Sequence, residues 1–330
     1  MNKWFPGHMV QGMRKMQNKL TDMDLLIEVH DARIPLSGRN PSLRETLLGA
    51  KPHILLLNKK DLVDQSYNET VISKLQNQGI DKIIYTDLMT KKTEKSGFEK
   101  ILPSVIKLVR STDRYNRSDR PEINVMVIGI PNVGKSCLIN RIRRPFRKGS
   151  PAQVGGNAGV TRCVMEKIKL SSDPLVYILD TPGILEPKIN NVDTYMKLAL
   201  CSSMSDDVVG IEVIADYALY WLNKNRTFSY MHHFDLEGEP SDNISEVLMK
   251  IAIKTNQFLK YRDMAASKIV PRPNLKGAAA VFVKAFRTGD LGKVMLDLDI
   301  MKKQSLIVTD PMLPFEADHT KTKLPGKESN

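Results

Sequence analysis

The sequence predicts an α/β fold in which a mostly parallel sheet carries helices on both faces, followed by an all-helical C-terminal domain. Between residues 24 and 180, apolar runs of strand length alternate with segments of helical periodicity. This alternation is typical of a parallel sheet with crossover helices. A glycine-rich loop separates one apolar run from the next helical segment. After residue 190 the strand signal weakens and helical periodicity takes over.

These changes along the chain predict three parts. We expect the α/β domain, with an N-terminal helix, over 1–205, a helical domain over 206–310, and a flexible tail over 311–330. The tail contains Pro, Thr, Lys and Gly, a composition that does not favour a packed core. The predicted strands are 24–31, 54–58, 82–87, 123–128 and 175–180. The predicted helices are 11–20, 66–78, 97–110, 137–142, 194–201, 208–223, 243–260 and 276–287.

Length and composition limit the class of protein. The chain has 330 residues, of which 42% are hydrophobic, enough for a substantial core and two domains. No apolar run approaches the roughly 18 residues that a membrane-spanning helix requires, so we predict none. The net charge of +12 favours a polyanionic partner, either nucleic acid or an anionic membrane surface. The three cysteines show no metal-ligand spacing, which fits a reducing compartment.

The glycine-rich loop at 129–136 has the sequence Gly-Ile-Pro-Asn-Val-Gly-Lys-Ser and lies between a predicted strand and a predicted helix. In this order, backbone N–H groups and a helix N-terminus can surround the α- and β-phosphates of a nucleotide. Lys135 would reach the β- and γ-phosphates, and Ser136 would hold Mg²⁺. An ordinary glycine-rich turn before a helix is the alternative. The predicted nucleotide contacts are Asn132, Val133, Gly134, Lys135, Ser136 and Cys137.

Two further motifs support a nucleotide site and predict its base. Asp180 ends an apolar run and begins Asp-Thr-Pro-Gly. Its carboxylate suits a water-mediated contact with Mg²⁺, while the N–H of Gly183 can turn toward the γ-phosphate. Upstream, another run ends in Asn58-Lys59-Lys-Asp61. The carboxylate of Asp61 can accept both N1–H and the exocyclic amino group of guanine, a donor pair that adenine lacks, so we predict GTP and GDP as ligands.

Two segments after the phosphate loop leave alternatives open. Residues 141–148 are rich in Arg and favour either contact with RNA or a solvated helix end. Residues 153–162 contain three glycines and no periodicity. This composition suits a segment that orders only around γ-phosphate and Mg²⁺, with Thr161 as the ordering ligand. Thr161 could instead simply begin a strand.

The order of the motifs is unusual. In an ordinary GTPase the phosphate loop precedes the Asn-Lys-x-Asp strand, but here Asn58 comes before Gly129. The same sheet can form if the original termini are joined through residues 111–121 and the chain is opened after Gly183, which is a circular permutation. The segment after Gly183 then runs directly into the helical domain, so a nucleotide-dependent shift can pass to it.

With these motifs the chain resembles the circularly permuted GTPases that assemble the large ribosomal subunit. The resemblance covers nearly the whole chain through motifs at 4–9, 31–35, 58–61, 129–136, 159–161, 180–183 and 286–292. It implies a P-loop GTPase sheet, an rRNA-binding helical domain, and the large ribosomal subunit and its rRNA as partners. Residues 35–41 favour the mitochondrial branch and a location in the matrix. Peripheral association with the inner membrane, and a bacterial or other organellar compartment, are the alternatives.

The catalytic machinery has one specific gap. Ile184 stands where Ras-like enzymes place a water-orienting Gln, so hydrolysis by the protein alone should be slow. The resemblance implies two substitutes: Asn132 as a ligand of K⁺, and His8 as a group acting at the γ-phosphate on the ribosome. Each has a plain alternative, a loop cap for Asn132 and a histidine packed beside Trp4 for His8.

The complete prediction for the site follows from these motifs and the resemblance. The catalytic residues are His8, Lys135, Thr161 and Gly183. The Mg²⁺ ligands are Ser136, Thr161 and Asp180, the K⁺ ligand is Asn132, and the base is bound by Asn58, Lys59 and Asp61. The leading hypothesis is a GTPase triggered by a ribosomal particle. The alternative is a GTP-gated adaptor, at a ribosome or membrane surface, that uses hydrolysis only for release.

Overall fold

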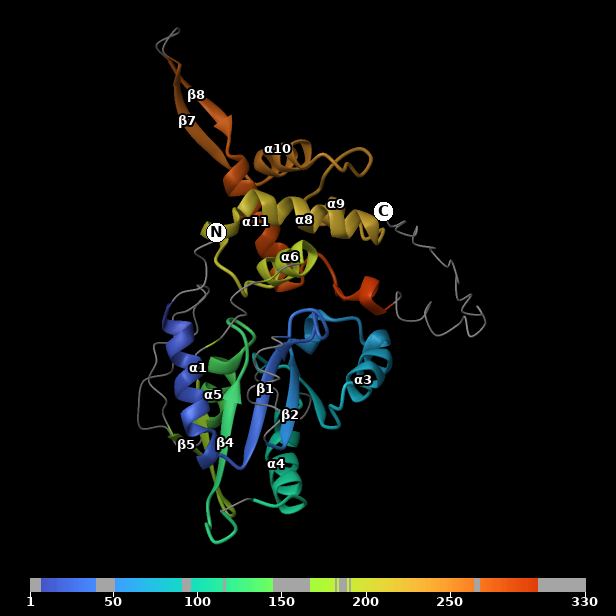
Figure 1. The fold of residues 1–330 in the computed structure, drawn as a ribbon. Coiled ribbons are helices and arrows are strands. Elements are labelled where there is room, and N and C mark those ends of the chain that lie inside the picture. Colours follow the sequence, from blue (N-terminus) through green and yellow to red (C-terminus); the bar gives the residue numbers. More distant parts are fainter. Residues whose placement is uncertain are drawn as a thin grey trace, which may run out of the picture.

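The computed structural model describes residues 7–39, 51–90, 96–114, 117–144, 167–181, 183, 189, 191–263 and 268–301, with the side chains of 7–11, 262–263 and 268–269 left out. A six-stranded sheet forms one half of the molecule, in the order β3-β2-β1-β4-β6-β5 (Figure 1). Its strands are β1 (Leu25–Asp31), β2 (His53–Asn58), β3 (Ile83–Thr86), β4 (Ile123–Ile128), β5 (Lys167–Ser172) and β6 (Leu175–Asp180).

The strand pairing confirms the predicted mostly parallel sheet. Every neighbouring pair is parallel except β5 and β6, which are antiparallel. Strand β5 was not predicted. Its sequence is Lys-Ile-Lys-Leu-Ser-Ser, it lies at the edge of the sheet, and only its Ile168 is buried. Polar and charged residues are common in edge strands, where they discourage pairing with another chain, and they weaken the apolar signal of a strand.

Helices cover both faces of the sheet, as predicted. Met16 lies in one apolar cluster with Leu26 and Met126, on one face of β1 and β4. The alternate residues of these strands point to the other face, where Val105 and Leu138 join the main core. The helices that pack on the sheet are α1 (Gly7–Lys19), α3 (Asn68–Gln76), α4 (Ile101–Arg110) and α5 (Lys135–Arg143).

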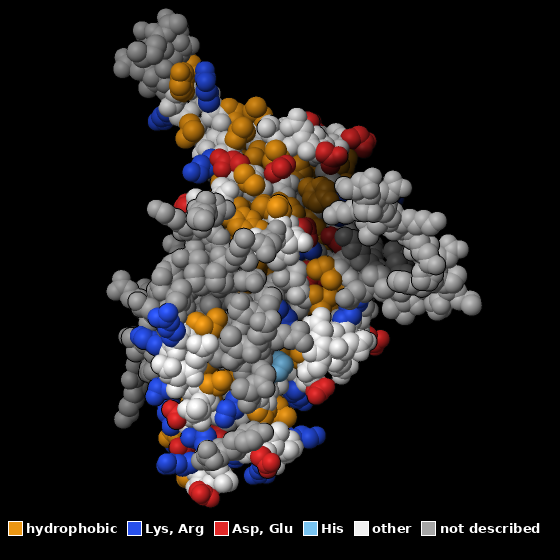
Figure 2. All heavy atoms as spheres, viewed as in Figure 1, with side chains coloured by type: hydrophobic (Ala, Val, Ile, Leu, Met, Phe, Trp, Pro, Cys, Tyr) orange, Lys and Arg blue, Asp and Glu red, His pale blue; other side chains and the backbone are white. Residues whose placement is uncertain are grey.

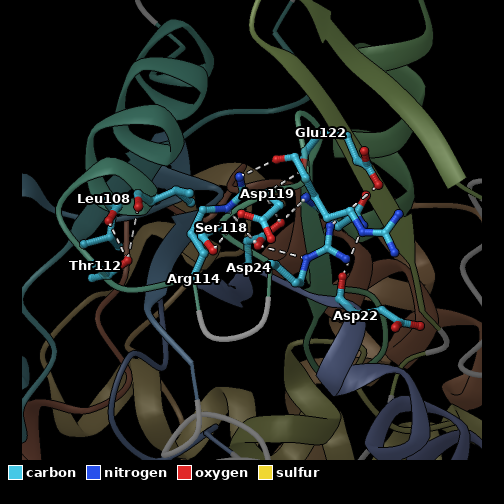
Figure 3. Close-up of polar contacts among 12 residues, drawn as sticks. Asp22, Asp24, Leu108, Thr112, Arg114, Ser118, Asp119 and Glu122 are labelled. Atoms are coloured by element: carbon cyan, nitrogen blue, oxygen red, sulfur yellow. Dashed lines mark hydrogen bonds and ion pairs between the residues drawn. The ribbon is translucent and has the colours of Figure 1, made fainter.

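The segment that joins the two halves of the permuted sheet is anchored by a buried carboxylate. Asp24, just before β1, accepts hydrogen bonds from Arg114 Nε (3.1 Å), Arg117 Nε (3.0 Å) and the backbone N of Asn124 (2.7 Å) (Figure 3). Arg114 also donates to the carbonyl oxygen of Glu122 at 2.6 Å. Arg114 and Arg117, which lie in the segment predicted to join the original termini, therefore tie that segment to the end of the sheet, because a buried carboxylate needs such partners.

The C-terminal half is helical, as predicted, and lies beyond the carboxyl ends of β1 and β2 (Figure 1). Its helices are α6 (Val192–Leu200), α7 (Asp206–Val209), α8 (Ile211–Lys224), α9 (Ser229–His233), α10 (Ile244–Lys254) and α11 (Leu275–Thr288). Among the described helices, none has the length and hydrophobicity needed to cross a bilayer. The division at residue 205 and the tail from residue 311 remain predictions, the tail lying outside the described residues.

The predicted helix over 243–260 is wrong in its last six residues. Helix α10 ends at Lys254, and the chain continues as an antiparallel hairpin of β7 (Phe258–Asp263) and β8 (Lys268–Pro273). Asn256 takes a positive φ of 54°, which ends the helix in a conformation that Asn tolerates better than most residues. The aromatic and β-branched residues that follow favour a strand. The C-terminal half is therefore helical with one added hairpin.

A short segment after α11 returns to the sheet. The backbone N of Val294 donates to the carbonyl oxygen of Leu62 at 2.9 Å, and that of Leu296 donates to Arg33 at 2.9 Å. The buried carboxylate of Asp297 accepts the backbone N–H of Leu36 at 2.8 Å. These bonds hold the helical half against the loops that follow β1 and β2.

Candidate functional site

The phosphate loop connects β4 to α5, as the motif predicts. Two glycines have backbone conformations that a side chain would not fit, Gly129 at φ 147° and Gly134 at φ 110°. A Cβ at Gly129 would collide with the carbonyl oxygen of Val29, and one at Gly134 with the side-chain amide of Asn58. Helix α5 begins directly after Gly134, so the unpaired N–H groups of its first turn face the loop. The arrangement can cradle a chain of phosphates.

The lysine of the loop is buried at the start of α5. Lys135 Nζ donates to the carbonyl oxygens of Gly129 (3.0 Å) and Ile130 (2.7 Å). Burial lowers the pKa of Lys135 to about 8, and the nearby carboxylate of Asp180 opposes this shift. A phosphate oxygen can replace these carbonyl acceptors and would stabilise the charged ammonium.

Two of the three predicted Mg²⁺ ligands, Ser136 and Asp180, lie on adjacent elements. Ser136 is in the first turn of α5, and Asp180 ends β6, whose register places it beside Val127 of β4. Within the described residues there is no cluster of three or more His, Cys, Asp or Glu residues that could hold a metal. One hydroxyl and one carboxylate fit Mg²⁺ in a nucleotide site, because that ion keeps several waters and takes further oxygens from the phosphates.

The residues after Asp180 pack against the phosphate loop. Thr181 Oγ1 donates to the carbonyl oxygen of Val127 at 2.5 Å, which fixes the end of β6. A Cβ on Gly183 would lie 2.8 Å from the backbone N of Pro131 and 3.0 Å from Lys135 Nζ. Only a glycine fits so close to the loop, and this position suits the predicted contact between its N–H and a γ-phosphate.

Asn58 joins the base-reading loop to the phosphate loop. Its Nδ2 donates to the carbonyl oxygen of Val133 at 2.8 Å. Its Oδ1 accepts the backbone N–H of Leu88 at 3.1 Å and the hydroxyl of Thr86 at 3.3 Å. One buried amide therefore connects the loops after β2, β3 and β4. The sequence predicted no role for the loop after β3, because Thr-Asp-Leu is a common pattern. The structure makes this loop part of the site, because β3 lies beside β2 and the loop bonds to Asn58.

The base-reading loop itself has a fixed backbone and an accessible acid. Lys59 has a left-handed φ of 62°, and its Nζ lies 2.9 Å from Oδ2 of the buried Asp31. Asp61 is exposed to solvent, but desolvation by the neighbouring protein atoms and the negative charge of Asp87 raise its pKa. Asp31 and Arg33 thus support the base-reading loop, whereas the sequence identified them only as part of the motif at 31–35. The position of this motif at the carboxyl end of a strand was the signal that could have predicted the role.

Asn132 has a partner that the sequence did not predict. Its Nδ2 donates to the carbonyl oxygen of Ser202, which follows α6, at 2.7 Å. Both residues have positive φ values, 59° for Asn132 and 63° for Ser202. The amide group therefore links the phosphate loop to the start of the helical half. Binding of K⁺ by Asn132 remains a prediction.

Several predicted residues lie apart from this described geometry. The side chain of His8, and all of Thr161 and Ile184, lie outside the described residues. Cys137 is half-buried in the first turn of α5, where burial raises its pKa and its Sγ lies 3.5 Å from Met89 Sδ. Arg141, the first residue of the basic run, is buried and donates to Ser96 Oγ at 2.9 Å, so its guanidinium packs inside the protein and is not part of an exposed basic surface.

Comparisons with known proteins agree with this geometry. A family model described as 50S ribosome-binding GTPase matches residues 124–236. The chain is 45% identical over 306 residues to mitochondrial ribosome-associated GTPase 1 of Bos taurus, with 92% of this chain and 90% of that protein covered. It is 48% identical over 299 residues to mitochondrial GTPase 1 of Aedes aegypti, with 90% and 93% covered. Ribosome biogenesis GTPase A of Bacillus licheniformis is 35% identical over 243 residues, with 73% and 81% covered.

Solved structures support the fold. A GNP-bound structure of YlqF from T. maritima matches with a TM-score of 0.52 at 23% identity, covering 87% of this chain and 97% of that chain. A GDP-bound structure of YlqF gives a TM-score of 0.54 at 22% identity, covering 86% and 98%. The predicted GTPase activity, permuted fold and mitochondrial location are confirmed by these matches and by the relatives' names. The chain belongs to the family of mitochondrial ribosome-associated GTPases.

Proposed function

We propose that this protein hydrolyses GTP while bound to the large subunit of the mitochondrial ribosome, and that it contributes to the assembly of that subunit. The observation that carries the proposal is the hydrogen bond from Asn58 to the carbonyl oxygen of Val133, which joins a guanine-reading loop to a phosphate loop. One guanine nucleotide can then contact both Asp61 and Lys135. The names of the relatives support the ribosomal partner.

Each predicted residue has a role in this proposal. Asp61 accepts from guanine, Lys135 and the N–H groups of residues 132–137 bind phosphates, and Gly183 donates to the γ-phosphate. Ser136 and Asp180 hold Mg²⁺, which when bound neutralises charge that develops on the phosphates. Thr161, His8 and K⁺ at Asn132 complete the proposed machinery. The hydrophobic Ile184 cannot orient water, which supports slow hydrolysis until a particle is bound.

The proposed partner is the large subunit with its rRNA, and the proposed compartment is the matrix. The net charge of +12 supports a polyanionic partner. Because an anionic membrane surface would satisfy the same charge, pelleting with cardiolipin vesicles is the check on peripheral membrane association.

The test is GTP turnover by the purified protein, alone and with mitochondrial large subunits, in K⁺ and in Na⁺ buffer. We expect slow turnover alone, acceleration by particles, and a further requirement for K⁺. Lys135→Ala should abolish turnover in every condition. Fast turnover that particles do not change would contradict the proposal. If His8→Ala supports normal subunit maturation without hydrolysing GTP, the protein is instead a GTP-gated adaptor.

A further inference from the structure

The hairpin β7–β8 projects from the helical half, away from the sheet that carries the nucleotide site (Figure 1). Its two strands pair only with each other in the described part of the chain. A two-stranded hairpin has little stability of its own and, without a third strand, leaves both faces open. Its side chains are therefore available to a partner.

One face of the hairpin combines apolar, aromatic and cationic groups. The register pairs Tyr261 with Val270 and Leu259 with Arg272, so these four residues share a face. Leu259 is 56% exposed and Tyr261 is 47% exposed. The guanidinium carbon of Arg272 lies 4.1 Å from the centroid of the Tyr261 ring. A flat, exposed stack of this kind is a surface on which another planar group can pack.

The charge of the hairpin is opposite to that of the adjacent helical surface. Its strands carry Lys260, Arg262, Lys268 and Arg272 against a single acid, Asp263. The segment before and into α10 carries Asp235, Glu237, Glu239, Asp242 and Glu246. Figure 2 shows basic and hydrophobic side chains on the hairpin and acidic side chains on the neighbouring helical surface. On the acidic surface, Lys254 pairs with Asp235 at 2.7 Å and Lys250 with Glu246 at 2.9 Å, so these lysines already have acidic partners. The strands of the hairpin carry net positive charge, which favours an anionic partner.

The outer edge of β8 is poorly suited to another protein strand. Asn274 N donates to the carbonyl oxygen of Gln257 at 2.9 Å, so the next pair, Phe258 and Pro273, is a non-hydrogen-bonded pair whose nitrogens face outward. Two residues away, the nitrogen of Pro271 faces the same edge. Proline has no N–H to donate, so a strand added there would lose two hydrogen bonds.

We propose that the β7–β8 hairpin is an RNA-binding element, in which the Tyr261–Arg272 stack receives an unpaired base, Arg272 contacts a phosphate, and Lys260, on the opposite face, adds a second phosphate contact. Stacking of bases on aromatic rings and guanidinium planes is a common way in which proteins bind single-stranded RNA. The inference rests on the proposed ribosomal function and names the part of the helical half that meets RNA.

The test is binding of fluorescein-labelled RNA stem–loops by the full-length protein over a range of salt concentrations. Tyr261→Ala should weaken binding by about tenfold or more, with little change in salt dependence. Lys260→Gln should weaken binding and reduce the salt slope by about one. Lys284→Gln, an equal loss of charge at an exposed position on α11, is the matched control and should bind like the wild type. Circular dichroism and thermal melting should be unchanged in all three variants.

The inference would be overturned if the hairpin variants bound RNA as tightly as the control does. It would also be overturned if these variants lost binding to anionic lipid vesicles while their RNA binding stayed normal. Particle-stimulated GTP turnover by the same variants separates this inference from the proposed function. If particles stimulate the wild type but Tyr261→Ala and Lys260→Gln bind RNA normally, the hairpin does not bind RNA. The proposed GTPase function would then still stand.

Discussion

Lys59 Nζ lies 2.9 Å from Oδ2 of Asp31, a carboxylate that also binds Arg33 Nε at 3.0 Å and Nη2 at 2.8 Å. Burial alone would raise the pKa of Asp31, but Arg33 and Lys59 hold it well below its usual range. The end of β1 therefore holds the side chain of Lys59, a residue with a left-handed backbone in the predicted guanine-reading loop. The same loop is bonded through Leu62 to Val294 after α11.

Replacing Asp31 by Asn should weaken both folding and nucleotide binding. The buried Arg33 would lose its countercharge, so we expect the free energy of unfolding to fall by about 3–5 kcal/mol. Lys59 would lose the contact that positions it, so bound GDP should dissociate faster. Urea unfolding and release of fluorescent GDP measure the two effects, with Asp64→Asn at an exposed turn as the control. Unchanged GDP release in a folded variant would exclude a positioning role.

Two substitutions at Asn132 separate its hydrogen bond from its predicted K⁺ contact. Asn132→Asp keeps a side-chain oxygen but loses the donation to Ser202, whereas Asn132→Ala loses both. If the oxygen binds K⁺, the Asp variant should retain K⁺-stimulated turnover, and the Ala variant should lose up to about 10²-fold. Equal loss in both variants would instead indicate that the link to Ser202 is what matters. Turnover in K⁺ and Na⁺ buffers provides the measurement.

Asp24 and Arg114, in the segment where the permuted halves are joined, should contribute to stability in a strongly coupled way. Arg114→Ala leaves a buried carboxylate with fewer partners and should cost about 3 kcal/mol of unfolding free energy. Adding Asp24→Asn should recover part of this loss, because the uncompensated charge is removed. Urea unfolding of the two single variants and the double variant gives the coupling. If the losses of unfolding free energy in the two single variants simply add up in the double variant, Asp24 does not hold the segment that contains Arg114.

Acid should destabilise the protein partly through His30. Burial lowers the pKa of His30, although Glu28 opposes the shift, and Nε2 lies 2.9 Å from the carbonyl oxygen of Ile34. The folded state therefore binds a proton at His30 only at a lower pH than the unfolded chain, which takes one up below about pH 6.5. Stability should fall as the pH drops from there, by at most about 1.4 kcal/mol per unit for this group. His30→Gln should show a flatter curve in urea unfolding between pH 5 and 7; parallel curves would contradict this.

Local signals were sufficient for most of the sheet and for the position of the glycine-rich loop between β4 and α5. Strands buried on both faces, such as β1 and β4, are almost entirely apolar, so their runs are visible in the sequence. The edge strand β5 and the hairpin β7–β8 were missed because exposed strands carry polar residues or lie next to a helical pattern. Helix 243–260 was extended too far because an Asn at a helix end is hard to distinguish from one inside it.

Contacts between distant segments could not be predicted. The links from Asn132 to Ser202 and from Leu62 to Val294 join residues whose types are ordinary and whose proximity depends on the complete fold. Asn58 was predicted to face the base, and its bond to Val133 shows a second role that only the structure reveals. Short motifs thus predicted the chemistry of the site, while the contacts between the loops became visible only in the tertiary arrangement.

The most direct test of the central claim is the base specificity of Asp61→Asn, measured as binding of fluorescent GDP, XDP and ADP beside the wild type and Lys135→Ala. The carboxylate should accept two guanine donors, so the variant should lose GDP affinity by about 10³-fold and gain affinity for XDP, whose 2-oxo group accepts from the new amide. Lys135→Ala should lose affinity for all three without changing their order. If Asp61→Asn binds GDP as tightly as the wild type, no single guanine nucleotide lies across these two loops.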